Sequence, residues 1–382
     1  MSRYWFYIKL FLRRFFNLAS FAYYYAIDTV VLFAPTQKLH EGTGIIKLDA
    51  IGDHILYRNL FQYLPTDGKK PFLIIPPNLK DIYTNLDQVD ELKLITLNPA
   101  KFNTNISYRL KKLYQIRKLC LKTIIVATNS KTTMLEDAMI RCSAAPRKIG
   151  AKDAGNNMPA LLISLTSKWY SQIIKTSPDI TFEHLRNVDF LSQLTKVKIS
   201  PMLEINLNTE QKELFVIFPG AGRPYRMWSP ENFKQVAKYL IAKNNMYGVV
   251  LGTKTDFELG EVIKSCAPDK VTNLCGQISL FESIKTTSSS RMIVCNESGP
   301  AHIGAALGVQ TVCISNGNHY GRFHPYPESL NKPIIHLYPP MLNKELSEKG
   351  VEFVINKYKL ISTLNINTVT PEHVISSIEK LF

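Results

Sequence analysis

The sequence has few cysteines, and none of them has the spacing of a metal site. The six cysteines include no Cys-x-x-Cys pair and no zinc-type spacing with histidine, which argues against structural zinc. A chain of 382 residues can bury a large core without disulfide bridges. We therefore expect small buried cysteines in a reducing compartment. They are Cys120, Cys142, Cys266, Cys275, Cys295 and Cys313.

Several cofactor and metal signatures are also missing. No Asp-x-Asp, the usual divalent-metal handle of many sugar-nucleotide enzymes, occurs in the chain. The segment Gly150–Asn157 imitates a phosphate loop but lacks its Lys-Ser/Thr ending. Gly220-Ala-Gly222 follows an apolar run, but Tyr225 stands where a dinucleotide fingerprint needs its third glycine. These absences disfavour P-loop ATP chemistry and NAD binding, and we expect no metal and no resident cofactor.

The charge balance is strongly basic. Lys and Arg total 46 against 31 Asp and Glu, a formal net charge of +15. This excess favours an anionic partner such as nucleic acid, anionic lipid or a phosphorylated substrate. No basic helix, zinc finger or aromatic RNA-binding signature is present, so we expect no nucleic-acid partner. A generally basic surface without a specific partner remains the alternative.

The overall composition is that of a globular protein with two domains. Hydrophobic residues make up 45% and charged residues 20%, which excludes disorder, collagen and coiled coil as the main architecture. The length fits two domains.

Residues 1–40 form an aromatic and basic arm. Polar side chains recur there every three or four residues, which predicts an amphipathic helix with one polar stripe. The cations Arg3, Lys9, Arg13 and Arg14 precede the first acid, Asp28. The stripe consists of Lys9, Arg13, Asn17, Ser20, Tyr24 and Asp28.

Four interpretations of this arm compete. Aromatic residues with Arg and Lys suit a helix lying in the plane of an anionic membrane surface, which we favour. A transmembrane span is less compatible, because Asn17, Ser20, Asp28 and Thr29 interrupt residues 15–34. A signal peptide lacks its small-residue cleavage site. A helix packed on the chain's own domains remains open.

From residue 44 apolar runs alternate with helical patterns, which predicts parallel sheets covered by helices. A polar segment, residues 196–212, has the composition of a linker between two α/β domains. Expected strands are Gly44–Leu48, Phe72–Ile75, Leu92–Leu97, Thr123–Ala127, Phe215–Phe218, Gly248–Leu251, Val271–Leu274, Met292–Cys295 and Thr311–Ile314. Expected helices are Ile55–Leu64, Tyr108–Leu119, Thr132–Arg141, Glu231–Lys243, Glu258–Cys266 and residues 371–382.

Three segments at strand ends carry chemistry. The first, Lys47-Leu-Asp-Ala-Ile-Gly52-Asp53, turns from a strand into a helix, where ligands of open α/β sheets bind. Gly52 permits a tight turn, and Asp53 is either a helix cap or a catalytic carboxylate. A helix dipole at this position would lower the pKa of Asp53 and weaken it as a base.

The other two segments suit an anionic ligand. In Phe218–Glu231, backbone amides of a glycine-rich loop together with Arg223 and Arg226 are able to cradle phosphate oxygens, although a solvated basic loop is the simpler alternative. In Cys295–Gly308, a strand meets a helix that begins near Gly299, and its N-terminus is suited to an anion. A lone histidine such as His302 is more often a packed residue than a catalyst.

In this order and spacing, the segments resemble glycosyltransferase family 9, the bacterial heptosyltransferases of lipopolysaccharide synthesis. The resemblance spans residues 44–330 and is most specific in the C-terminal half. It rests there on Pro219-Gly-Ala-Gly222, Trp228-Ser-Pro230, Leu251-Gly252, Asn273-Leu-Cys-Gly276 and Asn296-Glu-Ser-Gly-Pro-Ala-His302.

The resemblance implies a GT-B fold, in which two Rossmann-like domains face each other across a cleft. Residues 41–205 would form the acceptor-side domain, and residues 206–382, with a final helix, would bind the nucleotide sugar. It further implies an inverting, metal-independent transfer of a sugar from a nucleotide donor, ADP-heptose in the best-known members.

Site residues carry over by position. Asp53 matches the family's Gly-Asp aspartate, the proposed general base for the acceptor hydroxyl. Arg226 matches the basic residue that contacts donor phosphate, and Gly222 matches a loop position near the diphosphate. Asp256 or Glu258 lies where an acidic residue holds the nucleotide ribose.

The turn after the later strand also carries over. Ser298, Gly299 and His302 match the family's turn beside the donor sugar and phosphates. Glu297 replaces the usual Asp and is one methylene longer, so the donor sugar differs from the standard heptose if this acid holds sugar hydroxyls. Lys47 stands where many members have Arg.

The resemblance therefore implies transfer of a sugar, a heptose in known members, from an ADP-sugar to a lipid-linked glycan such as lipopolysaccharide core. The expected location is cytoplasmic, peripheral on the inner face of the bacterial inner membrane. Two alternatives stay open: another GT-B enzyme such as a nucleotide-sugar epimerase, and a non-catalytic scaffold that binds nucleotide sugars.

Overall fold

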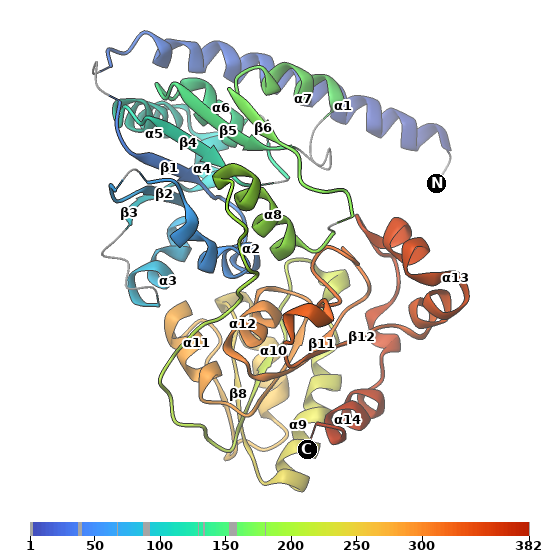
Figure 1. Ribbon diagram of the computed structural model, residues 1–382. Coiled ribbons are helices and arrows are strands. Elements are labelled where there is room, and N and C mark those ends of the chain that lie inside the picture. Colours follow the sequence, from blue (N-terminus) through green and yellow to red (C-terminus); the bar gives the residue numbers. More distant parts are fainter. Residues whose placement is uncertain are drawn as a thin grey trace.

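Two parallel sheets, one in each half of the chain, organise the molecule (Figure 1). The computed structural model describes residues 3–36, 40–66, 68–86, 92–128, 130–132, 134–152, 159–179 and 181–381, without the side chains of residues 3–17 and 244. Each sheet has six strands within these residues, and every strand pair is parallel. The expected α/β architecture is confirmed.

The first sheet has the strand order β3-β2-β1-β4-β5-β6. Its inner strands are short apolar runs that are buried on both faces, as in sheets covered by helices on both sides. The strands are β1 Thr43–Ile46, β2 Phe72–Ile75, β3 Lys93–Thr96, β4 Thr123–Val126, β5 Arg147–Ala151 and β6 Gln172–Ile174.

The second sheet, β12-β11-β10-β7-β8-β9, repeats that order. Its first strand in the chain, β7, lies beside its fourth, β10, as β1 lies beside β4. The strands are β7 Leu214–Phe218, β8 Tyr247–Val250, β9 Val271–Asn273, β10 Met292–Asn296, β11 Gln310–Ile314 and β12 Ile334–Leu337.

Helices cover both sheets. The first half contains α1 Arg3–Leu32, α2 Ile51–Ile55, α3 Lys80–Asn85, α4 Pro99–Thr104, α5 Ile106–Lys118, α6 Glu136–Cys142, α7 Ala160–Ser167 and α8 Glu183–Thr195. The second contains α9 Pro230–Asn244, α10 Phe257–Lys264, α11 Leu280–Ser288, α12 Gly299–Leu307, α13 Pro340–Tyr358 and α14 Pro371–Glu379. The 3₁₀ turns are η1 Arg58–Tyr63, η2 Pro77–Leu79, η4 Pro224–Arg226, η5 Lys254–Asp256, η6 Glu328–Leu330 and η7 Ile366–Thr368.

The expected helix over Ile55–Leu64 is wrong. The chain instead ends α2 at Ile55 and continues as the 3₁₀ turn η1. A 3₁₀ turn places side chains three residues apart on one side, and here the pairs Tyr57–Leu60 and Phe61–Leu64 are buried in the core. The short α2 leaves Asp53 in its first turn, at the carboxyl end of β1.

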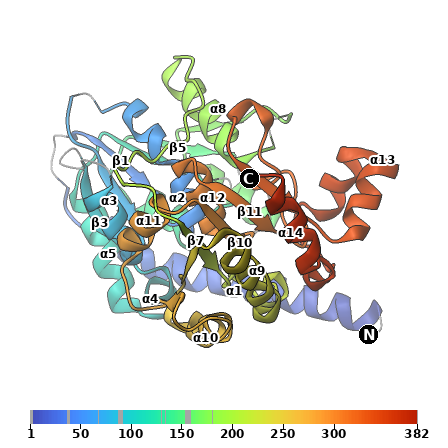
Figure 2. The ribbon, with the colours of Figure 1, turned by 90° about the horizontal axis from the view of Figure 1, so that it is seen from below.

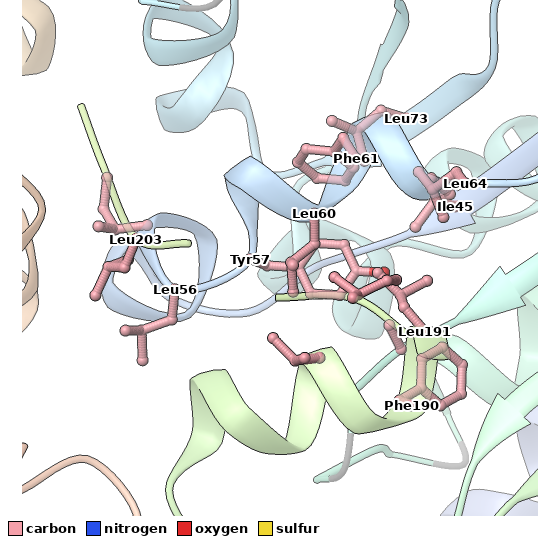
Figure 3. Close-up of a cluster of buried hydrophobic side chains, with 14 of the residues drawn as sticks. Ile45, Leu56, Tyr57, Leu60, Phe61, Leu64, Leu73, Phe190, Leu191 and Leu203 are labelled. Carbon is pink, nitrogen blue, oxygen red and sulfur yellow. The ribbon is translucent and has the colours of Figure 1, made fainter. Parts of the chain in front are cut away.

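One apolar cluster joins the two halves of the chain. It contains side chains from β1, α2, η1 and α8 together with Ile284, Ile303 and Leu330 from the second half. Figure 3 shows Ile45, Leu56, Leu60 and Leu191 with Leu203 in this cluster. The segment expected to be a linker therefore packs into the core at Leu203.

The arm is helical, and its C-terminal half packs on α5 and α6. Figure 2 shows the N-terminal end of α1 projecting past the rest of the molecule. Of the expected polar stripe, Lys9, Arg13 and Asn17 lie outside the described side chains, while Tyr24 and Asp28 face the protein. Asp28 forms a buried two-bond ion pair with Arg109, at 2.6 Å for each bond. Within the described residues, no helix has the length and apolar character needed to cross a membrane.

Asp28→Ala tests how α1 is held. Removing one partner of a buried ion pair leaves the other charge unpaired, which costs about 3–5 kcal/mol. We expect urea unfolding, followed by tryptophan fluorescence, to show a loss of that size. The matched control is Glu213→Ala, which breaks an exposed pair with Arg291 and should cost less than about 1 kcal/mol. Equal effects of the two variants would contradict this account of the docking.

Candidate active site at the domain interface

The candidate residues lie at the strand ends where ligands bind in open parallel sheets. In each sheet the direction of chain winding reverses at one place, between β1 and β4 and between β7 and β10. Such switch points leave a crevice at the carboxyl ends of the strands. Lys47–Asp53 follows β1, the glycine-rich loop follows β7, and Glu297–His302 follows β10. All three predicted segments therefore occupy switch points.

The two switch points face each other through the starts of α2 and α12, which pack together across the interface. A Cβ atom added to Gly52 would lie 2.7 Å from Cδ2 of His302, and one added to Gly299 would lie 3.3 Å from Ile51. Neither position has room for a side chain without a shift of its neighbours. The glycines therefore bring the start of α2, which carries Asp53, against the turn Glu297–His302 of the second domain.

A buried ion pair stands beside Asp53. Lys47 Nζ donates to Asp49 Oδ2 at 2.7 Å, and Thr128 Oγ1 donates to the same oxygen at 2.6 Å. Burial alone would raise the pKa of Asp49, but the Lys47 charge and these hydrogen bonds hold it below its usual value. Asp49 is therefore ionised at neutral pH.

Asp53 has the opposite shift. Burial raises its pKa to about 7, the Asp49 charge adds to the effect, and Lys47 opposes it. Among the residues that the structure describes, none donates a hydrogen bond to its carboxylate. The expectation that a helix dipole lowers this pKa is wrong, because α2 is only five residues long and burial beside a second carboxylate dominates. A carboxylate with a pKa near neutrality suits a general base.

Arg226 and Glu297 of the second domain form a pair, and Glu297 lies near enough to Asp53 for its pKa to respond to that charge. Arg226 contacts the Glu297 carboxylate and donates to its backbone carbonyl at 2.6 Å, while its Nε is buried without a partner among the described residues. Burial raises the pKa of Glu297 to about 7, the Arg226 charge opposes this, and Asp53 adds to it. The predicted phosphate-binding arginine and the predicted sugar-binding acid thus hold each other.

The glycine-rich loop is tied to this turn by Asn296. Its amide donates to the Pro219 carbonyl at 2.7 Å, and its oxygen accepts from the Trp228 backbone at 2.9 Å. Gly222 is exposed at the tip of the loop, and a Cβ there would touch nothing within 4 Å. The protein's own packing therefore leaves the space beside Gly222 open.

The two acids proposed for a ribose have different environments. Asp256 accepts hydrogen bonds from the backbone and hydroxyl of Thr253, both at 2.7 Å, and lies against Gly220. Glu258 is exposed in the first turn of α10. The Asp256 carboxylate thus shapes the loop that bears Gly222.

His302 and Ser298 complete the turn. His302 is buried, its Nδ1 pairs with the Tyr326 hydroxyl at 2.7 Å, and burial with the Arg226 charge lowers its pKa to about 4. It is neutral at pH 7 and packs against Gly52, as a structural histidine would. Ser298 donates to the Asn296 carbonyl at 3.3 Å and begins α12.

An ion pair between the domains lies beside this site, and the sequence motifs did not predict it. Arg322, in the loop after β11, donates to buried Glu183 of α8 at 2.8 Å and to Ser130 at 2.9 Å. The Glu183 backbone returns a bond to the Arg322 carbonyl at 2.8 Å. Arg322 follows the predicted strand Thr311–Ile314, but no predicted element or motif pointed to Glu183. Asp49 and Asn296 stood inside the quoted motifs without a role of their own. Among the described side chains, no group of three or more His, Cys, Asp or Glu is placed to hold a metal ion.

Comparison with known proteins shows which family the chain matches. The family model described as "Glycosyltransferase family 9 (heptosyltransferase)" matches residues 117–351, more than half of the chain. Lipooligosaccharide heptosyltransferase 2 of Haemophilus ducreyi is 32% identical over 135 residues. That match covers 34% of this chain and only 37% of the relative's length.

Solved structures show the same fold over nearly the whole chain. A glycosyltransferase family 9 protein from Veillonella parvula superposes with a TM-score of 0.67 at 17% identity, over 91% of this chain and 99% of that one. The E. coli heptosyltransferase WaaC with ADP gives a TM-score of 0.67 at 15% identity, over 88% and 99%. E. coli ADP-heptose lps heptosyltransferase II gives 0.64 at 16%, over 89% and 98%. The two Rossmann-like domains are thus those of the GT-B fold, and the chain is a glycosyltransferase that belongs to family 9.

Proposed function

We propose that this enzyme transfers a heptose from an ADP-linked donor to a hydroxyl of a lipid-linked glycan, such as lipopolysaccharide core. The reaction is an inverting displacement that needs no metal. The similar WaaC structure contains ADP, which supports the choice of nucleotide. The observation that carries the proposal is the Asp53 carboxylate, with a pKa near 7, at the contact of α2 with α12, near enough to Glu297 of the other domain to raise its pKa.

Asp53 acts on the acceptor. Its carboxylate takes the proton of the acceptor hydroxyl while that oxygen attacks the anomeric carbon of the donor. The bond from this carbon to the diphosphate oxygen breaks, and its electron pair leaves with ADP. Asp49 keeps Asp53 basic enough for this step, because its negative charge disfavours a second carboxylate beside it.

The second domain holds the donor and stabilises the leaving group. Amides near Gly222, the Arg226 guanidinium and the start of α12 at Gly299 lie on the loop and turn that Asn296 holds together. In this proposal, these groups stabilise the negative charge that develops on the leaving diphosphate. Glu297 and Ser298 bind sugar hydroxyls in this proposal, and an acid near Asp256 or Glu258 binds the ribose. The Arg322–Glu183 pair holds the domains together and so limits access of water to the donor.

Asp53→Asn tests the base. We expect transfer from ADP-heptose to a truncated lipopolysaccharide core, followed by ADP release, to fall at least about 100-fold. Stabilisation of the protein by ADP in a thermal shift should stay unchanged. In the unmodified enzyme the rate should rise with pH through about 7, because only the deprotonated carboxylate accepts a proton, and level off above it.

Asp269→Asn, a change of the same kind at an exposed position, is the matched control and should leave the rate unchanged. Full transfer by Asp53→Asn would refute its role as the base. Conversion of the donor without acceptor would instead favour an epimerase.

Substitution of Gly222 tests the diphosphate position. A side chain there meets no protein atom within 4 Å, so Gly222→Ala and Gly222→Val should leave the melting temperature without ligand unchanged. If the diphosphate lies beside this loop, the Kd for ADP rises with side-chain size, by about tenfold for valine, or 1.4 kcal/mol. Calorimetric titration measures this. Unchanged affinity in both variants would place the diphosphate elsewhere.

A further inference from the structure

The packed half of α1 faces the protein with its polar side, whereas an ordinary surface helix faces the protein with its apolar side. Its polar groups bond to the protein: Asp28 pairs with Arg109, and the Tyr24 hydroxyl donates to the Asn103 carbonyl. Arg141 donates to the Tyr25 carbonyl at 2.8 Å and to the Thr29 hydroxyl at 2.7 Å. The side that a surface helix normally shows to water is therefore used for docking.

The side left outward is apolar. At 3.6 residues per turn, the exposed positions from 18 to 33 fall within one arc of about 160°. This arc contains no charged residue, and Phe33 in it is 83% exposed. Its members are Leu18, Ala19, Ala22, Tyr23, Tyr25, Ala26, Val30 and Phe33.

α7 extends this apolar face. Leu161 and Leu165 are 59% and 42% exposed. The helix leads directly into Trp169, whose ring stacks on Phe21 and Tyr25 at 6.2 and 6.1 Å between centroids. Figure 1 shows α7 beside α1, at the end of the first domain that lies away from the second domain. We call the outward side of these two helices the α1–α7 face.

The charges around this face identify its occupant. Residues 1–27 contain four cations and no acid, and residues 154–178 contain Lys168 and Lys175, both exposed, and no acid. A second copy of a chain of net charge +15 would bring like charge against like. An anionic lipid surface complements these cations, each worth about 1 kcal/mol there. Tyr and Trp suit the boundary between headgroups and acyl chains.

We propose that the α1–α7 face binds the surface of an anionic lipid bilayer, with both helices lying in the plane of the interface. The Asp28–Arg109 pair fixes α1 so that the first domain rests on the membrane. The second domain then points away from it. This surface is separate from the transfer site, so the inference extends the proposed function without depending on it.

Vesicle flotation tests the proposal. The full chain should float with vesicles of phosphatidylcholine containing 30 mol% phosphatidylglycerol, and bind much less to phosphatidylcholine alone or at high salt. Leu161→Glu with Leu165→Glu should weaken partitioning more than tenfold. The matched control is Val351→Glu with Leu360→Glu, at exposed apolar positions in and after α13, and should stay within twofold of the unmodified chain.

Two results would overturn the proposal. One is equal binding of the α7 variant and the unmodified chain, which would remove α7 from the contact. The other is an absence of vesicle binding. If sedimentation without lipid then shows a dimer that the α7 variant dissociates, the face binds a second copy of the chain instead. A thermal shift with ADP on the same samples reports the donor site separately, so failure of the membrane proposal is distinguishable from failure of the proposed function.

Discussion

Two helix starts meet at the domain interface at glycines that leave no room for a side chain of their own, and the site depends on that contact. Gly52 and Gly299 let α2 and α12 approach until His302 lies where a side chain on Gly52 would be. The shared apolar cluster and the Arg322–Glu183 pair hold the domains in this position. Because both helices begin at switch points of their sheets, the contact joins Asp53, the proposed base, to the loop and turn proposed to hold the donor.

The electrostatics of the site follow from what is buried beside Asp53. The positive charge of Lys47 keeps Asp49 ionised. The negative charge of Asp49 then adds to the effect of burial, and together they raise the pKa of Asp53. Across the interface Arg226 fails to keep the pKa of Glu297 at its ordinary value, because burial outweighs it. The pair of carboxylates with pKa values near neutrality is typical of sites where protons move at pH 7.

Patterns local in sequence predicted most of the fold and the three segments that meet at the candidate site. Nine strands were predicted because they are apolar runs that end in turns. Three strands were not predicted: β5 begins with two cations, β6 has three residues, and β12 is a four-residue run that His336 interrupts. The turns at Gly52-Asp53 and Ser298–His302 were found because glycine and capping residues mark them. Arg322 and Glu183 were missed because they stand 139 residues apart and meet only across the domains. The orientation of α1 was missed because a polar stripe does not show whether it faces water or protein.

In the proposed mechanism Asp53 is a base that its neighbours poise near neutral pH. The direct measurement is a carbon NMR titration of the chain labelled at aspartate carboxyls, with Asp53→Asn to assign the signal. We expect Asp53 to titrate near pH 7 in the unmodified protein and at lower pH in Asp49→Asn, which removes the neighbouring negative charge. A value near 4 in both proteins, the ordinary pKa of an aspartate, would contradict the account.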